Sequence, residues 1–329
     1  MPYNQNSGWG RALLNMVASQ VPAFGNVHVV FNSDDSDEKN YQHLQDVAAP
    51  DGDGNIRFFT SNAAAYAACE SNNNDVVLLD ANSAHSEAML TVSKNRIHFI
   101  GMDGGGRLNS QGARLQTPNT SVAASTAVIK NTGTRNTYIN IKFIQQGTNA
   151  AQLTAFHDTG EGTYVKNCSM IHTTLLTTAA RSCLRFEGDT CHYEDCQIGN
   201  ATVLTAVANI APLQIKTPAR YSYFIRCNFI SYSSQTTASC IDIPDTNGVI
   251  GWIIFRDCAL INASKGNGTT ASGAMTEAVT SKGTAGFLYF QHCSSYQATK
   301  FQEAQAALWN DATADGATAG DGGKGTAGA

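Results

Sequence analysis

The hydrophobic and polar positions of residues 138–295 follow one short pattern that returns six times. A large apolar residue comes first, a second apolar residue follows it by three positions, and a third follows the second by two positions. The first positions are Tyr138, Val165, Tyr193, Phe224, Phe255 and Phe290; the second are Ile141, Cys168, Cys196, Cys227, Cys258 and Cys293; the third are Phe143, Met170, Ile198, Phe229 and Leu260, with Ser295 breaking the pattern in the last copy. Successive copies lie about 27 to 35 residues apart, a period typical of solenoid proteins.

The spacing within each copy predicts a sharp bend. Steps of three and then two residues fit neither a plain strand nor a helix, but they fit two strands joined at a corner. The corner residues are Asn140, Asn167, Asp195, Arg226, Asp257 and His292. Asn and Asp tolerate the left-handed backbone conformation that such a corner needs. Arg226 and His292 suit it less well and count against the bend.

A second motif lies upstream of most copies, where an apolar segment runs into a turn of Gly, Asp, Thr or Pro. It occupies residues 129–133, 156–160, 186–190, 215–219 and 243–247. Each copy therefore contains strand, turn, strand, corner, strand and then a longer loop. This order predicts an all-β fold, a right-handed parallel β-helix over residues 97–300. Stacking buries the apolar columns of each rung against the next rung.

The segments before and after the repeats do not follow the repeat pattern. Residues 26–96 alternate strand and helix and form, in this interpretation, a small N-terminal α/β cap. Its expected strands are 27–31, 56–60 and 75–80, and its expected helices are 37–47 and 62–70, the second capped by Ser61. Residues 1–25 form an N-terminal arm. Residues 301–329 are predicted to be a C-terminal helix, over 302–309, and a low-complexity tail.

The entry into the repeats resembles that of pectate-lyase-like β-helix proteins. The residues that carry this likeness are the apolar strand 75–80, which follows the alanine-rich helix, and the segment Ile97-His98-Phe99-Ile100-Gly101-Met102-Asp103-Gly104. The chain as a whole, from its Ser7-Gly8-Trp9-Gly10-Arg11 arm to its Ala/Gly/Thr tail, is similar to structural proteins of tailed bacteriophages. That second resemblance implies a homotrimer in the virion, assembled in the host cytoplasm. It also implies contacts with other virion proteins, such as a major capsid protein.

Composition and charge disfavour several classes of function. Charged residues make up 14% of the 329 residues and the net charge is -5, which disfavours nucleic-acid binding. No apolar stretch approaches the length of about 20 residues that spans a membrane. The first 20 residues lack the basic start and continuous apolar segment of a secretory signal.

The nine cysteines predict packing in place of metal binding or disulfides. Five of them share one position of the repeat, and there is no CxxC pair of the kind that holds structural zinc. We expect free thiols in a reducing compartment, and neither metal nor cofactor. The segment Asp51-Gly52-Asp53-Gly54-Asn55 begins like a calcium loop. It has Ile56 where that loop needs Gly, so we interpret it as a turn.

Three residues are the weak candidates for catalysis. His157, Asp158 and Glu187 follow upstream strands on neighbouring rungs, which stack at about 4.8 Å. Asp158 and Glu187 would then lie within the range of a glycosidase carboxylate pair. The plainer interpretation is a set of solvated turn residues.

Two further groups are candidates for surface contacts. Asp195, Arg226 and Asp257 are expected to form an exposed charge ladder along the corner. Trp9 and Arg11 are candidate partner-binding residues, because Trp and Arg are common at interface hot spots. The alternative for this arm is a frayed terminus.

Three functions remain open after the sequence. The first is a non-enzymatic phage virion protein that decorates or cements the capsid. The second is a tailspike or tail fibre protein that binds host polysaccharide, either with or without cleaving it. The third, a secreted polysaccharide lyase, is disfavoured by the missing export signal. A cement protein is expected to contact partners through its terminal segments, and a tailspike to present a groove with carboxylates.

Overall fold

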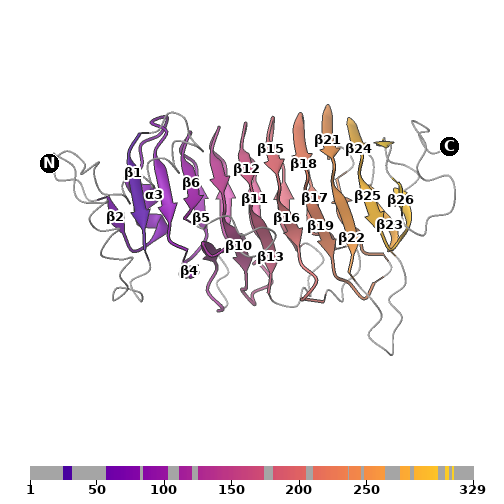
Figure 1. Cartoon of the computed structure of the whole chain (residues 1–329), viewed down its shortest axis with the longest axis horizontal. Helices are drawn as coiled ribbons and strands as arrows, with labels where there is room; N and C mark the ends of the chain where they lie inside the picture. The colour runs from indigo at the N-terminus through magenta and orange to yellow at the C-terminus, as the bar shows by residue number, and fades with distance from the viewer. Residues whose placement is uncertain are drawn as a thin grey trace.

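The chain winds into a parallel β-helix built from three long sheets. The structure is a computed structural model that describes residues 25–31, 57–81, 84–102, 111–120, 125–173, 181–204, 210–235, 237–245, 248–263, 275–281, 285–302, 308–310 and 313–314. Within these ranges, sheets A, B and C contain 11, 9 and 8 strands. Figure 1 shows the strands side by side along the long axis of the molecule, from the N-terminal strands at one end to the C-terminal strands at the other.

Each sheet takes one strand from each rung. Sheet A contains, in spatial order, β2 (Phe58–Phe59), β1 (Val27–Val30), β3 (Val76–Leu79), β6 (His98–Gly101), β9 (Thr137–Ile139), β12 (Tyr164–Lys166), β15 (His192–Glu194), β18 (Ser222–Ile225), β21 (Trp252–Arg256), β24 (Phe287–Gln291) and β27 (Leu308–Asn310). Sheet B contains β4 (Ala84–Ser86), β7 (Arg114–Gln116), β10 (Lys142–Gln145), β13 (Ser169–His172), β16 (Gln197–Gly199), β19 (Asn228–Ser231), β22 (Ala259–Asn262), β25 (Ser294–Tyr296) and β28 (Thr313–Ala314). Sheet C contains β5 (Leu90–Val92), β8 (Ile129–Asn131), β11 (Thr154–Asp158), β14 (Ser182–Phe186), β17 (Leu213–Ile215), β20 (Ile241–Ile243), β23 (Met275–Ser281) and β26 (Ala298–Gln302).

The order of strands within a rung is the predicted one. The upstream motif supplies a strand of sheet C, such as β11, and the two halves of the repeat supply sheets A and B, such as β12 and β13. Every pair of neighbouring rungs is joined by parallel ladders, for example β11 with β14 and β12 with β15. The predicted all-β parallel β-helix is therefore confirmed.

The corner between sheets A and B has a left-handed backbone in all six copies. The φ angles are 58° at Asn140, 50° at Asn167, 54° at Asp195, 52° at Arg226, 53° at Asp257 and 51° at His292. The expectation that Arg226 and His292 count against the bend was therefore wrong. Their side chains pair with the corner carboxylates beneath them, Arg226 with Asp195 and His292 with Asp257, and stacking against the neighbouring rungs holds the same bend.

The interior is a stack of matching side chains. Register places Tyr193, Phe224, Phe255 and Phe290 one above another, and all four side chains are buried. The ring centroid of Phe255 lies 4.9 Å from that of Phe224 and 4.6 Å from that of Phe290, and the ring planes are nearly parallel. Stacked rings of this kind combine a large buried apolar area with a favourable ring geometry. This column therefore adds to the cohesion that the backbone ladders give between rungs.

The cysteine column lies beside the aromatic one. The Cys227 thiol donates to the carbonyl oxygen of Tyr193 at 3.6 Å on the preceding rung and to that of Ile225 at 3.4 Å. The same two-carbonyl arrangement recurs at Cys168, Cys196, Cys258 and Cys293. All nine cysteines are free and buried. Burial raises the pKa of Cys183 and Cys240 to about 12, so these side chains are thiols at neutral pH.

The predicted capping helix is present at the N-terminal end. Helix α3 (Asn62–Ala68) begins after Ser61, whose hydroxyl accepts a hydrogen bond from the amide of Ala64 at 3.2 Å. Tyr66 stacks on Phe99, with ring centroids 6.4 Å apart, and extends the interior column. The coil nevertheless starts earlier than residue 97. Strands β1 and β3 already belong to sheet A, β4 to sheet B and β5 to sheet C, because their apolar positions continue the interior columns.

The C-terminal segment differs from the expected helix over 302–309 wherever it is described. Gln302 ends β26, and Leu308 and Trp309 belong to β27. These strands pair with β23 and β24, so ladder hydrogen bonds with the preceding rung outweigh the local helical composition. The arm 1–24, the expected helix 37–47, the turn 51–55 and the tail 315–329 lie outside the described residues. No helix among the described residues has the length and apolar character to cross a membrane.

Removing one ring from the aromatic column should destabilise the whole coil. We expect Phe255→Ala to lower the free energy of unfolding by about 3–5 kcal/mol, because a fully buried ring is lost and a cavity remains between its two stacked neighbours. Urea denaturation followed by circular dichroism measures this loss. The matched control is Tyr296→Ala, at a side chain that is 46% exposed, which should stay within about 0.5 kcal/mol of the unchanged protein. Equal effects of the two substitutions would contradict the stacked core.

Candidate functional site

The outer surface of sheet A is rich in aromatic side chains. Strands alternate inward and outward residues, so each inward member of the aromatic column is preceded by an outward residue. Register aligns the outward residues Tyr164, His192, Tyr223, Ile254 and Tyr289 in one row. Tyr221, Trp252 and Phe287 lie beside that row. We call the set Tyr164, His192, Tyr221, Tyr223, Trp252, Phe287 and Tyr289 the aromatic face.

Neighbouring rings on the aromatic face touch one another. The ring centroids of Tyr164 and His192 are 5.5 Å apart, and those of His192 and Tyr223 are 5.9 Å apart. The ring centroid of Trp252 lies 5.0 Å from that of Tyr223 and 5.7 Å from that of Tyr221, and both pairs are arranged nearly edge to face. Tyr221 is 40% exposed and Phe287 is 47% exposed. Contiguous exposed apolar surface on a soluble protein marks an interaction site more often than an accident of sequence.

Charged and hydroxyl groups line one edge of the aromatic face. The Tyr164 hydroxyl donates to Glu194 Oε2 at 2.8 Å, and Lys166 Nζ lies 3.7 Å from Glu194 Oε1. Arg226 binds Asp195 with two hydrogen bonds, of 2.7 and 3.0 Å, and also contacts Glu194. Partial burial acts to raise the pKa of Glu194, but the hydrogen bonds from Tyr164 and Arg226 outweigh it and lower that pKa. The Glu194 carboxylate is therefore ionised at neutral pH and held in place.

The same edge continues toward the C-terminal rungs with weaker pairing. Arg256, which is exposed on β21, donates from Nε to the amide oxygen of Gln291 at 3.1 Å. At the corner, His292 Nδ1 lies 3.5 Å from Asp257 Oδ1, and both side chains are largely exposed. Asp195, Arg226 and Asp257 thus lie along an exposed ladder of charges. Exposed pairs of this kind contribute little to stability, and their polar groups remain accessible to a ligand.

Aromatic rings beside fixed polar groups are suited to binding a polyhydroxylated ligand. Ligand sites commonly combine aromatic surface with a few placed polar groups that fix orientation. Tyr and Trp supply rigid apolar faces, and their polar atoms still form hydrogen bonds. The aromatic face repeats this combination on successive rungs, about 4.8 Å apart. It therefore fits a long ligand that lies along the axis of the coil.

The candidate cluster on sheet C is only partly assembled. His157 and Arg185 are outward neighbours in register, and Glu187 follows β14 beside them. Glu187 Oε1 accepts from Arg185 Nε at 2.5 Å and lies 3.4 Å from His157 Nε2. Burial acts to raise the pKa of Glu187, but His157 and Arg185 lower it to about 2. A carboxylate held ionised in this way is a poor proton donor.

Asp158 points the other way and does not pair with Glu187. Its side chain is fully buried, because β11 continues through His157 to Asp158 and carries Asp158 on its inner face. Oδ2 accepts from the Tyr193 hydroxyl at 2.7 Å, while Oδ1 accepts from Asn131 Nδ2 at 2.9 Å and from the Gly160 amide at 3.0 Å. Burial raises the pKa of Asp158. The structure therefore brings together His157 and Glu187, and separates Asp158 from both.

Two other candidates remain, a small cavity among the described residues and the N-terminal arm. The cavity, lined by His172, Cys183, Asn200 and Pro212 among others, has a volume of about 20 Å³. That is room for about one water molecule and none for a sugar. Trp9 and Arg11 lie outside the described residues, so partner binding through the N-terminal arm stays a prediction.

Comparisons with known proteins bear on the fold. No family model matches the chain, and no curated protein matches it. Among solved structures, a pectin methylesterase variant in complex with a hexasaccharide is similar, with TM-score 0.60 and 14% identity over 92% of this chain and 93% of that one. The pectin methylesterase of Erwinia chrysanthemi gives TM-score 0.54 and 13% identity over 92% of each chain. A pectate lyase gives TM-score 0.53 and 12% identity over 90% of this chain and 79% of that one.

The shared architecture is a right-handed parallel β-helix. A protein of Geobacillus virus E2 is also similar, with TM-score 0.50 and 10% identity over 78% of this chain and 54% of that one. Identities this low show the fold alone. They confirm the pectate-lyase-like resemblance at the level of the fold, while phage origin, the homotrimer and capsid decoration stay predictions.

The aromatic face was missed at the level of sequence, although a signal for it exists. In five of the six copies, the residue just before the first repeat position is Tyr164, His192, Tyr223, Ile254 or Tyr289. Alternation in a strand predicts that these residues point outward. Large apolar and aromatic residues at outward positions are the informative exception in a soluble protein.

The pairing of Glu187 gives a pH-dependent contribution to stability. Because its pKa in the folded protein is about 2, below its usual 4.5, the contribution is present above about pH 4.5 and is lost as the pH falls toward 2. We expect Glu187→Gln to lower the free energy of unfolding at pH 7 by about 1–3 kcal/mol, and the difference to vanish near pH 2. Denaturant midpoints between pH 2 and 7 measure this. Glu161→Gln, at an exposed side chain on the neighbouring turn, is the control and should show no such dependence. A difference that persists at pH 2 would contradict the assignment.

Proposed function

We propose that this chain is a bacteriophage virion protein of the tail fibre or tailspike class, which binds polysaccharide through the aromatic face of sheet A. The observation that carries the proposal is the run of touching, partly exposed rings from Tyr164 through His192 and Tyr223 to Trp252 on successive strands, with the Phe287–Tyr289 pair on the next strand. Such a run offers repeated apolar contacts along one line. A polymer of sugar rings is the ligand class that repeats in the same way.

The polar edge supports a sugar ligand over a purely apolar one. Hydroxyl groups of a sugar both donate and accept hydrogen bonds, and the edge offers both kinds of partner. Glu194 on β15 supplies carboxylate acceptors, and Arg256 on β21, two strands further along the sheet, supplies exposed donors. These charged groups are largely fixed by existing pairs, so little side-chain entropy is lost when a ligand binds.

One structural neighbour supports polysaccharide binding, and another supports a place in a virion. A structural neighbour among the pectin methylesterases was solved with a bound hexasaccharide, so this fold can hold an oligosaccharide in that protein. Another neighbour is a viral protein, which is consistent with a place in a virion. Neither neighbour is close enough in sequence to transfer a ligand or a role to this chain.

The proposal is for binding without cleavage. A glycosidase needs one carboxyl group with a raised pKa that is exposed to the glycosidic oxygen. Of the candidate carboxylates, Glu187 has a pKa lowered to about 2 by its partners, and Asp158 has a raised pKa but is fully buried. The cement role through Trp9 and Arg11 remains the competing prediction. It places the binding surface on the terminal arm instead of on sheet A.

Binding to surface polysaccharides tests the proposal directly. The probe is a panel of purified bacterial capsular and lipopolysaccharide O-chain polysaccharides, titrated against the full chain with tryptophan fluorescence and calorimetry. We expect saturable binding to at least one member. Trp252→Ala and Tyr223→Ala should each weaken it by about tenfold, because each removes a contacting ring worth roughly 1–1.5 kcal/mol.

The control lies on another face of the same coil. Lys130→Ala changes an outward residue of sheet C and should leave the affinity unchanged. No binding across the panel would contradict the proposal, as would an affinity that Lys130→Ala lowers as much as Trp252→Ala does. In either case the terminal arm becomes the surface to test.

A further inference from the structure

A histidine stands at the N-terminal end of the otherwise apolar interior column. Register aligns His28 on β1 with Val77 on β3, and Val77 with Phe99 on β6. Phe99 in turn stacks on Tyr138 at 5.4 Å, so His28 continues the inward column of sheet A. Its neighbour two residues on, Val30, is fully buried in the core. A polar ring at this position needs a reason beyond packing.

The His28 imidazole is buried without a hydrogen bond. The residue is 5% exposed, and neither ring nitrogen has a hydrogen-bond partner among the described residues. The two tyrosines of the same column are different. The Tyr138 hydroxyl donates to Asn131 and the Tyr193 hydroxyl donates to Asp158. An unpaired buried polar group costs about 1–3 kcal/mol, so His28, unlike these two tyrosines, has ring nitrogens free to bind a ligand.

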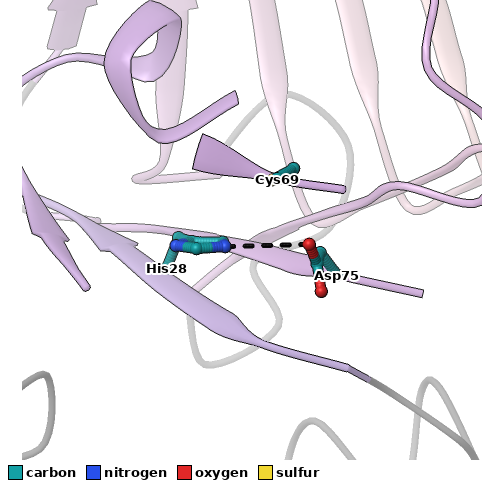
Figure 2. Close-up of side chains that lie close together, drawn as sticks. All are labelled: His28, Cys69 and Asp75. Atoms are coloured by element: carbon teal, nitrogen blue, oxygen red, sulfur yellow. Dashed lines mark ion pairs between the residues drawn. The ribbon is translucent and has the colours of Figure 1, made fainter. Parts of the chain in front are cut away.

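Two other metal-binding side chains converge on His28. Cys69 follows helix α3, and Asp75 directly precedes β3. One ligand atom from each of the three residues lies within 4.8 Å of the other two, and all three residues are buried. Figure 2 shows the imidazole of His28 facing the carboxylate of Asp75, with Cys69 beside them. The ligand atoms come from three separate segments, which the fold alone brings together.

The Asp75 carboxylate is held in a fixed orientation. Oδ1 accepts from the Asn26 amide at 2.7 Å and from Asn73 Nδ2 at 2.8 Å, and Oδ2 accepts from the Glu70 amide at 2.6 Å. His28 Nε2 lies 3.9 Å from Oδ2. Hydrogen bonds to the carboxylate from behind are the usual support of a metal-binding side chain. They leave Oδ2 facing the imidazole.

We propose that His28, Cys69 and Asp75 bind one zinc ion at the N-terminal end of the coil. Zinc takes nitrogen, sulfur and oxygen ligands at about 2.0–2.3 Å, so tetrahedral ligand atoms stand roughly 3.5 Å apart. The 3.9 Å between His28 and Asp75 therefore closes with a shift of a few tenths of an ångström. Calcium and magnesium prefer all-oxygen sites and do not suit a thiol and an imidazole.

Binding changes one bond at Cys69. The thiol now donates to the Ala65 carbonyl at 3.3 Å; on binding, the S–H bond breaks, the sulfur lone pair forms the bond to zinc, and the proton leaves to solvent. Three protein ligands leave the fourth tetrahedral position to a water molecule. The ion would tie β1, the end of α3 and the start of β3 together at the N-terminal end of the described coil. This role is independent of polysaccharide binding.

Cobalt substitution tests the site. The full chain, freed of metal by chelator dialysis, is titrated with Co²⁺ and then with Zn²⁺. We expect one equivalent of Co²⁺ to give a near-ultraviolet thiolate-to-cobalt band, which Zn²⁺ abolishes by displacement. Zinc at about 100 times its dissociation constant should also raise Tm by about 5 °C.

Two variants make the result specific to Cys69. Cys69→Ser, which retains a hydroxyl donor for Ala65, should lose both the band and the Tm shift. Cys240→Ser, at an equally buried cysteine of the core, should keep both. If Cys69→Ser does not fold, His28→Gln takes its place and should weaken Co²⁺ binding at least tenfold. The proposal is overturned if the unchanged protein binds no Co²⁺ at one equivalent, if Cys69→Ser keeps the band, or if His28→Gln binds as tightly. His28 and Asp75 are then an ion pair only.

Discussion

The structure depends on the registered stacking of one rung on the next. Strands of three to five residues, such as β12 and β21, form no stable unit alone. Parallel ladders align equivalent positions of every rung, and so place ring on ring and thiol beside thiol. Because side chains alternate along a strand, this register also decides which residues face out. The interior columns and the outer surface are therefore set by the same constraint.

The outer surface of sheet A is a consequence of that constraint. Once Tyr193 and Phe224 are fixed inward, His192 and Tyr223 must point outward and lie next to one another. An aromatic residue at that position in several rungs becomes a continuous surface, not a set of scattered residues. The coil thus converts a repeat in sequence into a line of equivalent binding positions at the rung spacing. A polymeric ligand matches that geometry better than a compact one does.

The interior was predictable from the sequence because burial restricts which residues are tolerated. The columns through Phe255 and Cys258 and the corner at Asn140 follow from spacing alone. The ends of the coil were not predictable in this way. Around β1 and β27 the repeat fades, and pairing with an existing sheet edge imposes strands on segments whose local composition is ambiguous.

The candidate sites show the limits of sequence analysis more sharply. Asp158 was assigned to an exposed turn after the strand, but it is the last residue of β11, where it alternates with His157 and points inward. His28, Cys69 and Asp75 are distant in sequence and share no motif, so only the folded chain brings them together. Recognising the aromatic face required a consideration of the outward positions as well as the buried ones.

The reactivity of the cysteines tests the stacked interior most directly. All nine are buried thiols, and five of them occupy one column of the core. In a titration with an aromatic disulfide reagent at pH 8, the account predicts no fast-reacting thiol in the native chain and nine in denaturant. Several thiols that react in the native chain as fast as they do in denaturant would contradict it, because the column would then face solvent and the rungs would not be stacked as described.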